Sequence, residues 1–117
     1  MALLSLIPLA IGCGKGNASA PQGIASDKVP TVINQAFNQA SDANRQLAAN
    51  YVSDFQNQNT ALAFADLDQI LHSQELSPEE RDVARHAMVT TMQQLRDAAK
   101  NGNQQAQNEL HHYLISR

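Results

Sequence analysis

The four histidines are the first residues of this sequence whose chemistry could define a site. They are His72, His86, His111 and His112. No pair has the His-Glu-x-x-His spacing that places two zinc ligands and a base on one helical face. Glu109 and His112 are neighbours on a helix, but they bind a metal only with ligands from elsewhere. We therefore predict a solvated pair and no metal site. A periplasmic carrier of a metal or small ligand, using His86, His111 and His112, remains an alternative.

The acidic residues and Cys13 give no catalytic arrangement by their spacing. Asp66 and Asp68 are two residues apart and lie on diverging sides of a helix, so they cannot act together as acid and base. Cys13 has no adjacent base that would make it a nucleophile. The sequence contains neither a Gly-x-Ser-x-Gly elbow nor a glycine-rich phosphate loop between a strand and a helix. We expect that the protein is not an enzyme and binds no cofactor.

The cationic and thioether residues allow two interpretations. Arg81 and Arg85 are four residues apart on the expected outer face of a helix. With Arg96 they would contact an acidic partner, although the same pattern is typical of solvated side chains. Met88 and Met92 would line an adaptable groove or fill the core, and core packing suffices to explain them.

Composition limits the size and the partners of the protein. The 117 residues carry a formal net charge of -3 with 16% charged residues, so one small domain without a basic surface for nucleic acid is expected. Aromatic residues make up 4% and Trp is absent. We expect a thin core of Leu, Ile, Val, Met and Ala, which leaves a small margin of stability.

The first twelve residues are apolar almost throughout and carry no charged side chain. They are too few to span a bilayer as a helix, which takes about 20 residues, but suit the apolar region of a secretory signal. The run Leu9-Ala10-Ile11-Gly12-Cys13 resembles the lipobox of bacterial lipoprotein precursors, although Ala10 replaces the more usual Leu. The resemblance implies cleavage between Gly12 and Cys13 and acylation of Cys13.

The residues after Cys13 suit a tether. Residues 14–25 are small and include Gly, Ser and Pro, a composition typical of flexible linkers. We predict a signal segment (1–12), a lipidated linker (13–25) and a helical domain (26–117). Membrane lipid would then be a partner through acylated Cys13, on the extracytoplasmic side of the cell envelope. Alternatively, Cys13 is a free thiol in an apolar segment packed on the domain of a cytosolic helical protein.

The best-defined helix of the domain begins at Ser77-Pro78-Glu79-Glu80. Ser77 is expected to cap the helix, with Pro78 in the first turn and Glu80 reaching back in a capping box. Lys100 and Gly102 mark its end. The sequence therefore predicts a helix from Pro78 to Asn101.

The remaining helices follow from apolar periodicity. One long helix is expected from residue 30 to about 56, then helices over 61–73 and 103–115. Residues 98–110 resemble the turn between helices in tetratricopeptide and Sel1-like repeats, which implies helical-hairpin stacking and no activity. We predict an all-α fold of about four helices in antiparallel hairpins.

The apolar stripe of the first expected helix includes three aromatic residues. Phe37, Tyr51 and Phe55 form a candidate partner face for a homo-oligomer or for another envelope protein. Alternatively, the stripe is internal core. The sequence thus predicts a small envelope lipoprotein with a structural or protein-interaction role.

Overall fold

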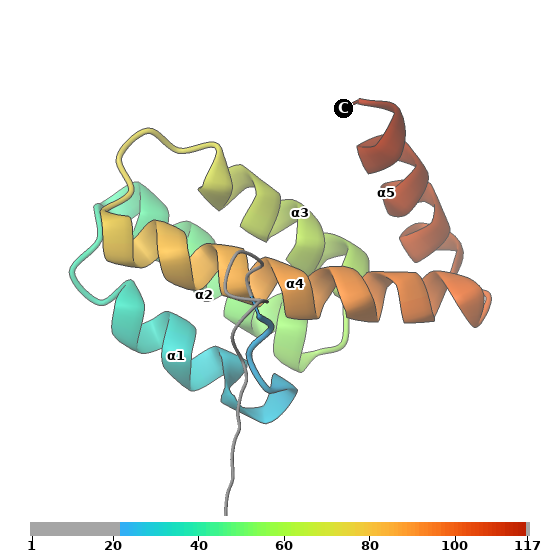
Figure 1. Ribbon diagram of the computed structural model, residues 1–117, viewed down its shortest axis with the longest axis horizontal. Helices are drawn as coiled ribbons and strands as arrows, with labels where there is room; N and C mark the ends of the chain where they lie inside the picture. The colour runs from blue at the N-terminus through green and yellow to red at the C-terminus, as the bar shows by residue number, and fades with distance from the viewer. Residues whose placement is uncertain (1–21, 117) are drawn as a thin grey trace, which may run out of the picture.

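The computed structural model describes residues 22–116 of the chain. The expected signal segment, Gly12 and Cys13 lie outside this range. The described residues form helices and no strand, which confirms the all-α prediction. The elements are a 3-10 turn η3 (Ser26–Lys28), α1 (Val29–Ala36), α2 (Asp42–Gln56), α3 (Thr60–Leu71), α4 (Pro78–Lys100) and α5 (Gln104–Ile115). In Figure 1, α4 crosses the body between α1 and α3, and α5 projects from its far end.

The start of α4 has the predicted capping box. Ser77 Oγ accepts a hydrogen bond from the Glu80 N–H at 3.1 Å, and Glu80 Oε1 accepts one from the Ser77 N–H at 3.1 Å. Pro78 occupies the first turn, where its missing N–H leaves no helical bond unmade. Two otherwise unpaired backbone donors are therefore satisfied, and the long central helix begins at a fixed residue.

α4 ends in a turn at Gly102. Gly102 has a φ of 95°, its N–H donates to Ala99 O at 3.2 Å, and the Asn103 N–H donates to Ala98 O at 3.0 Å. These two bonds form a Schellman motif, which needs a left-handed residue at this position. The predicted closing glycine is confirmed, and it sets the direction in which α5 leaves α4.

We expect Gly102→Ala to lower the free energy of unfolding by about 1 kcal/mol, because a Cβ disfavours the left-handed conformation. Nothing lies within 4 Å of the added Cβ, so the loss is conformational rather than steric. Urea denaturation followed by circular dichroism measures it. Gly102→Asn should lose less, since Asn tolerates positive φ. Equal losses in both variants would contradict this explanation.

The single helix predicted over residues 30–56 is wrong. α1 ends at Ala36, the chain turns after Phe37, and α2 begins at Asp42. Ser41 Oγ caps α2 by accepting a hydrogen bond from the Asn44 N–H at 3.3 Å. The apolar period continues across the break because α1 and α2 face the same core, so periodicity alone hid the new helix start.

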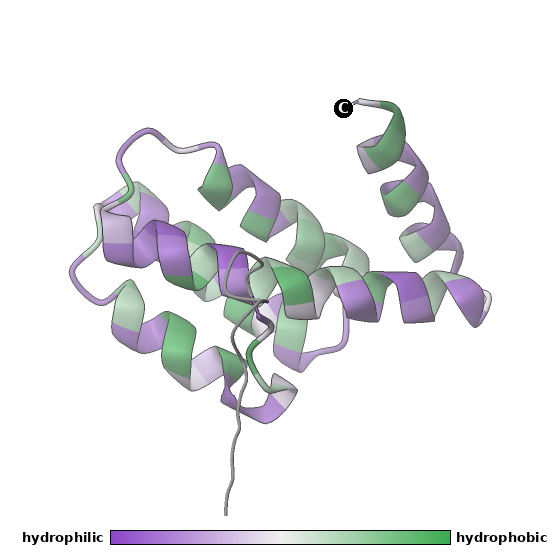
Figure 2. Cartoon of the chain, viewed as in Figure 1, coloured by the Kyte–Doolittle hydropathy of each residue, from purple (hydrophilic) through white to green (hydrophobic). Residues whose placement is uncertain are grey.

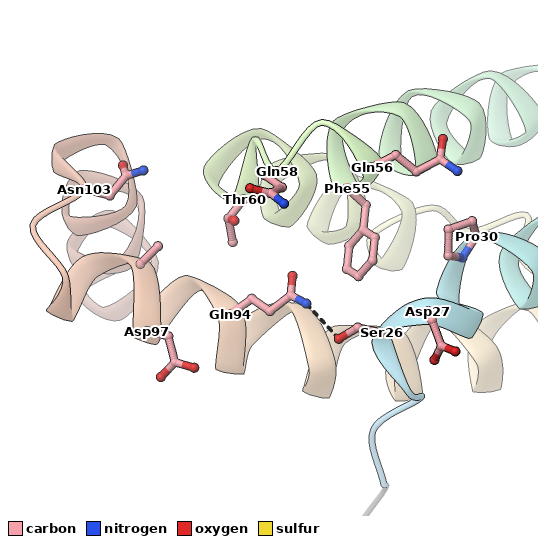
Figure 3. A pocket seen from close by; sticks show the side chains of 11 residues that line it. Ser26, Asp27, Pro30, Phe55, Gln56, Gln58, Thr60, Gln94, Asp97 and Asn103 are labelled. Atoms are coloured by element: carbon pink, nitrogen blue, oxygen red, sulfur yellow. Dashed lines mark hydrogen bonds between the residues drawn. The ribbon is translucent and has the colours of Figure 1, made fainter.

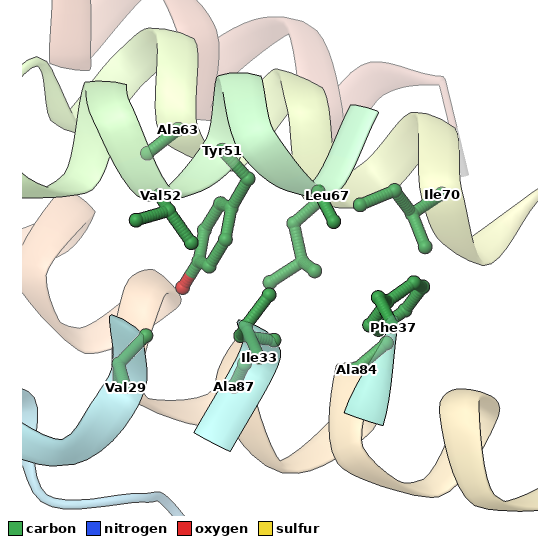
Figure 4. Close-up of a cluster of buried hydrophobic side chains, with 11 residues drawn as sticks. Val29, Ile33, Phe37, Tyr51, Val52, Ala63, Leu67, Ile70, Ala84 and Ala87 are labelled. Atoms are coloured by element: carbon green, nitrogen blue, oxygen red, sulfur yellow. The ribbon is translucent and has the colours of Figure 1, made fainter. Parts of the chain in front are cut away.

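The main core joins α1, α2, α3 and α4 (Figure 4). Its buried members are Val29, Ile33, Phe37, Ala48, Tyr51, Val52, Ala63, Leu67, Ile70, Ala84 and Ala87. Figure 2 shows polar and apolar residues alternating around these helices, as expected when each buries one stripe. The prediction of a purely aliphatic core is wrong, since Phe37, Tyr51 and Phe64 are the three largest fully buried side chains.

A smaller cluster attaches α5 to the body. Phe64, Leu95 and Ala106 are fully buried in it. The ring of Tyr113 meets that of Phe64 edge to face, with centroids 5.0 Å apart. Such a pair stabilises by about 0.5–1.5 kcal/mol beyond its buried area. α5 is therefore held mainly through one side, which leaves its opposite side exposed.

Candidate functional site

The expected partner face is divided between the interior and the surface. Phe37 and Tyr51 are 2% and 0% exposed and belong to the chain's own core. Tyr51 Oη lies 2.7 Å from Thr91 Oγ1, and because the Thr91 hydroxyl donates to Ala87 O at 2.8 Å, Tyr51 is the donor. The pKa of Tyr51 is raised to about 12, because the effect of burial is larger than the opposite effect of the hydrogen bond to Thr91. Only Phe55 is partly exposed, so the three residues do not form one accessible face.

The histidines do not meet in one place. His72 lies at the end of α3, and His111 and His112 are exposed on α5. His86 Nδ1 is 2.5 Å from Gln22 O, which makes this nitrogen the donor. Within residues 22–116, no group of three or more His, Cys, Asp or Glu is placed to hold a metal ion.

Residues 22–26, which we name the strap, lie along α4. The three contacts are His86 Nδ1 to Gln22 O at 2.5 Å, Thr90 Oγ1 to Ile24 O at 2.6 Å, and Gln94 Nε2 to Ser26 Oγ at 2.9 Å. On α4, successive contact residues are four positions apart, which corresponds to a rise of about 6 Å along the helix. On the strap they are two positions apart, which corresponds to about 6.6 Å in an extended chain. The two spacings match. The predicted flexible linker therefore does not extend to residue 25, because residues 22–25 are docked on the helix.

Gly23 allows the strap to approach α4 closely. A Cβ at this residue would lie 2.8 Å from Thr90 Oγ1 and 3.4 Å from Val89 Cγ1. Gly23→Ala should displace the strap and weaken the Thr90–Ile24 hydrogen bond, with a loss of about 1 kcal/mol. NMR chemical shifts of residues 22–26 measure the release. Ala25→Ser, at an exposed neighbouring position, is the control, and equal shifts in the two variants would contradict this packing argument.

Two carboxyl groups from different helices form a pair that the sequence did not predict. Asp66 on α3 lies beside Asp54 on α2, and Asp66 Oδ2 is buried without a hydrogen-bond donor among the described residues. Burial raises the pKa of Asp66 from 3.8 to about 7, and the hydrogen bond that protonated Asp66 makes to Asp54 and the charge of Asp54 act in the same direction. Asp66 is therefore partly protonated near neutral pH. Asp68, the neighbour considered from sequence, is instead close to His72, with Asp68 Oδ1 3.7 Å from Nδ1.

A pocket of about 600 Å³ lies where η3, the start of α1, the end of α2, the start of α3, α4 and the N-cap residue of α5 meet (Figure 3). Phe55 forms its apolar part, facing the Gln94–Ser26 hydrogen bond, and Gln58 and Thr60 lie on the α3 side. Neither Asp54 nor Asp66 lines it. This pocket is the candidate site, because it gathers polar side chains from several elements around one aromatic ring.

No family model, curated protein or solved structure matches this chain. None of the helices in the described range is both long and apolar enough to cross a bilayer. The functional argument therefore rests on the residues and their geometry.

Proposed function

We propose that this protein is a bacterial envelope lipoprotein, anchored through acyl chains on Cys13, whose helical body has a structural or protein-interaction role. The observation that carries the proposal is the uncharged apolar run of residues 1–12 ending at Gly12-Cys13 and followed by small residues. Each buried methylene of an acyl chain contributes about 0.8 kcal/mol, so two or more chains hold a protein stably on a membrane.

The strap supports an anchored role, because it fixes the point at which the segment that carries Cys13 would connect to the helical body. It is bound to α4 from Gln22 onward. Residues 13 and 22 are nine residues apart, and an extended chain of that length reaches about 30 Å. The lipidated protein would thus keep α4 within about one small-domain diameter of the membrane surface.

The interaction role is better supported at α5 than at the face expected from sequence. The large apolar side chains that are most exposed in the described range are Leu62 (54%), Leu114 (57%) and Ile115 (67%). Two of the three lie in the last turn of α5, the helix attached mainly by one side. We assign partner binding to this end of the body, since exposed apolar residues that are close together favour association.

The decisive experiment is the intact mass of the protein recovered from the membrane fraction of a bacterial host, compared with a Cys13→Ala variant. We expect a mass that lacks residues 1–12 and carries acyl chains, and we expect that mass to be absent from the variant. An unprocessed chain in the cytosolic fraction would refute the lipoprotein proposal and support the cytosolic alternative.

A metal titration separates this proposal from the carrier alternative. With no cluster of three ligands in the described range, we expect calorimetry to detect no saturable heat with zinc below about 1 mM. Saturable heat that disappears in a His111→Ala, His112→Ala variant would favour the carrier instead.

A further inference from the structure

The lining of the candidate pocket is mostly polar and contains no cationic side chain. Its eleven residues include two carboxylates, several primary amides and hydroxyls, the ring of Phe55 and the ring of Pro30, but no Lys, Arg or His. Asp27 and Asp97 give this part of the surface a negative charge. Anionic ligands are therefore disfavoured, and the remaining candidates are neutral or cationic molecules rich in hydrogen-bonding groups.

Most of this hydrogen-bonding capacity is unused within residues 22–116. Within residues 22–116, the side chains of Asp27, Gln56, Gln58, Thr60 and Asp97 make no hydrogen bond or ion pair, whereas Gln94 is fixed by Ser26. A primary amide offers two donors and one acceptor oxygen, and a carboxylate offers two acceptor oxygens. The pocket can therefore satisfy several donor and acceptor groups of a ligand without breaking internal bonds.

The wall of the pocket also contains a residue with a left-handed backbone conformation. Gln58 has a φ of 62°, the only positive φ among the non-glycine residues described. This conformation costs about 1 kcal/mol or more for a residue with a Cβ, and Gly or Asn would adopt it more easily. The conformation belongs to the end of α2: the Gln58 N–H donates to Phe55 O at 3.2 Å and the Asn59 N–H donates to Asp54 O at 2.9 Å, which are the two bonds of a Schellman motif. This motif fixes the backbone from which the Gln58 amide reaches the pocket wall.

The aromatic floor has a fixed orientation. The Phe55 ring packs against the buried ring of Tyr51, with centroids 5.7 Å apart and an angle of 44° between the planes. Because Tyr51 is anchored by its hydrogen bond to Thr91, Phe55 is held from behind while part of it remains accessible. An apolar face of a ligand would thus find a preorganised surface.

We propose that this pocket binds a neutral saccharide, with the C–H face of one sugar ring on Phe55 and its hydroxyls bonded to the surrounding amides and carboxylates. Sugar hydroxyls both donate and accept, which is the combination that amides and carboxylates match. The ring has one apolar face, which matches a single aromatic side chain. A wide, shallow pocket leaves the rest of an oligosaccharide in solvent. This activity goes beyond the anchoring role and does not depend on lipidation.

The test is an NMR titration of the full chain carrying Cys13→Ala, which removes lipidation from the comparison. The probes are maltotriose and tri-N-acetylchitotriose, with trigalacturonic acid as an anionic trisaccharide and capped trialanine as a neutral peptide. We expect at least one neutral trisaccharide to give saturable shifts at Phe55, Gln58 and Asn103, with a Kd of about 1 mM. The anionic sugar should bind at least about tenfold more weakly, because it meets Asp27 and Asp97.

Three variants locate the site. Gln58→Gly removes an amide where glycine suits the backbone, so it should fold at least as well as the parent and bind at least about fivefold more weakly. Phe55→Leu keeps apolar volume but removes the ring, and we expect about tenfold weaker binding. Gln93→Ala, an exposed amide beside Gln94 that does not line this pocket, is the matched control and should bind as the parent does.

Several results would overturn the proposal. They are the absence of saturable shifts with both neutral trisaccharides up to about 20 mM, tighter binding of the anionic sugar, and saturation by the peptide alone. Shifts that are equal in the parent, Gln58→Gly and Phe55→Leu would place any binding elsewhere. Circular dichroism melts of each variant show whether it is folded, so lost binding is not confused with unfolding.

Discussion

Phe37→Asp is expected to unfold the helical body rather than to separate a complex. Phe37 is 2% exposed at the end of α1 and packs in the cluster that joins four helices. The substitution removes a buried aromatic ring, at a cost of about 3–5 kcal/mol, and requires a carboxylate to be buried or the helix end to be expelled. A domain of this size has about 5–15 kcal/mol of total stability, so most of it would be lost.

Circular dichroism and size-exclusion chromatography measure this outcome together. The matched control is Leu114→Asp, which places the same charge on a side chain that is 57% exposed and should change stability by less than about 0.5 kcal/mol. If Phe37→Asp stayed folded and only shifted the elution of a larger species, Phe37 would be an intermolecular residue, as the partner-face hypothesis requires. If Leu114→Asp weakened an association while the fold persisted, the partner surface would lie on α5.

Local signals in the sequence were sufficient for α4 and for the turn that follows it. Ser77, Pro78 and Glu80 act within one helical turn, and Gly102 acts through its own backbone angle, so no distant contact is needed to predict them. The break between α1 and α2 carried a comparable local signal, Ser41-Asp42. The apolar stripe nevertheless looks continuous across this signal, because α1 and α2 both pack their apolar residues into the same core.

The stripe identified which residues are apolar and aligned, but not what covers them. Phe37 and Tyr51 are covered by α3 and α4 of the same chain, and this depends on contacts between residues far apart in sequence. The same limit applies to the strap. Its composition is that of a linker, and only the spacing of His86, Thr90 and Gln94 on α4 shows why it is docked.

The candidate pocket could not be predicted from spacing, because its lining comes from several elements and none of them contributes more than three side chains. The Asp54–Asp66 pair is non-local for a related reason. Carboxyls on two helices become neighbours only when the α2–α3 hairpin has its actual register. Asp68 is the carboxylate nearest to Asp66 in the sequence, but it lies on a different side of α3.

The Asp54–Asp66 pair predicts a pH dependence of stability with a definite sign. The pKa of Asp66 is about 7 in the folded protein and 3.8 in the ordinary reference state. Between these values the folded state keeps a proton that the unfolded chain has released, so this group makes the fold less stable as pH rises from about 4 to about 7. Above that range its effect is constant, and below it the effect vanishes.

Asp66→Asn isolates this contribution, because the amide is neutral at every pH and its N–H can donate to Asp54. We expect the variant to match the parent near pH 4 and to exceed it by about 1–2 kcal/mol near pH 8. That value is well below a full conversion of the pKa shift, since the side chain is only partly buried and solvent screens its charge. Urea unfolding at a series of pH values measures the difference. Asp68→Asn, which removes a second carboxylate from α3, is the control. A curve for Asp66→Asn that runs parallel to that of the parent would mean that Asp66 is ionised in the folded protein without cost, and that the two carboxyls are not packed together. A difference that grows between pH 4 and 7 and then stays constant would instead confirm that the α2–α3 interface holds a proton at neutral pH.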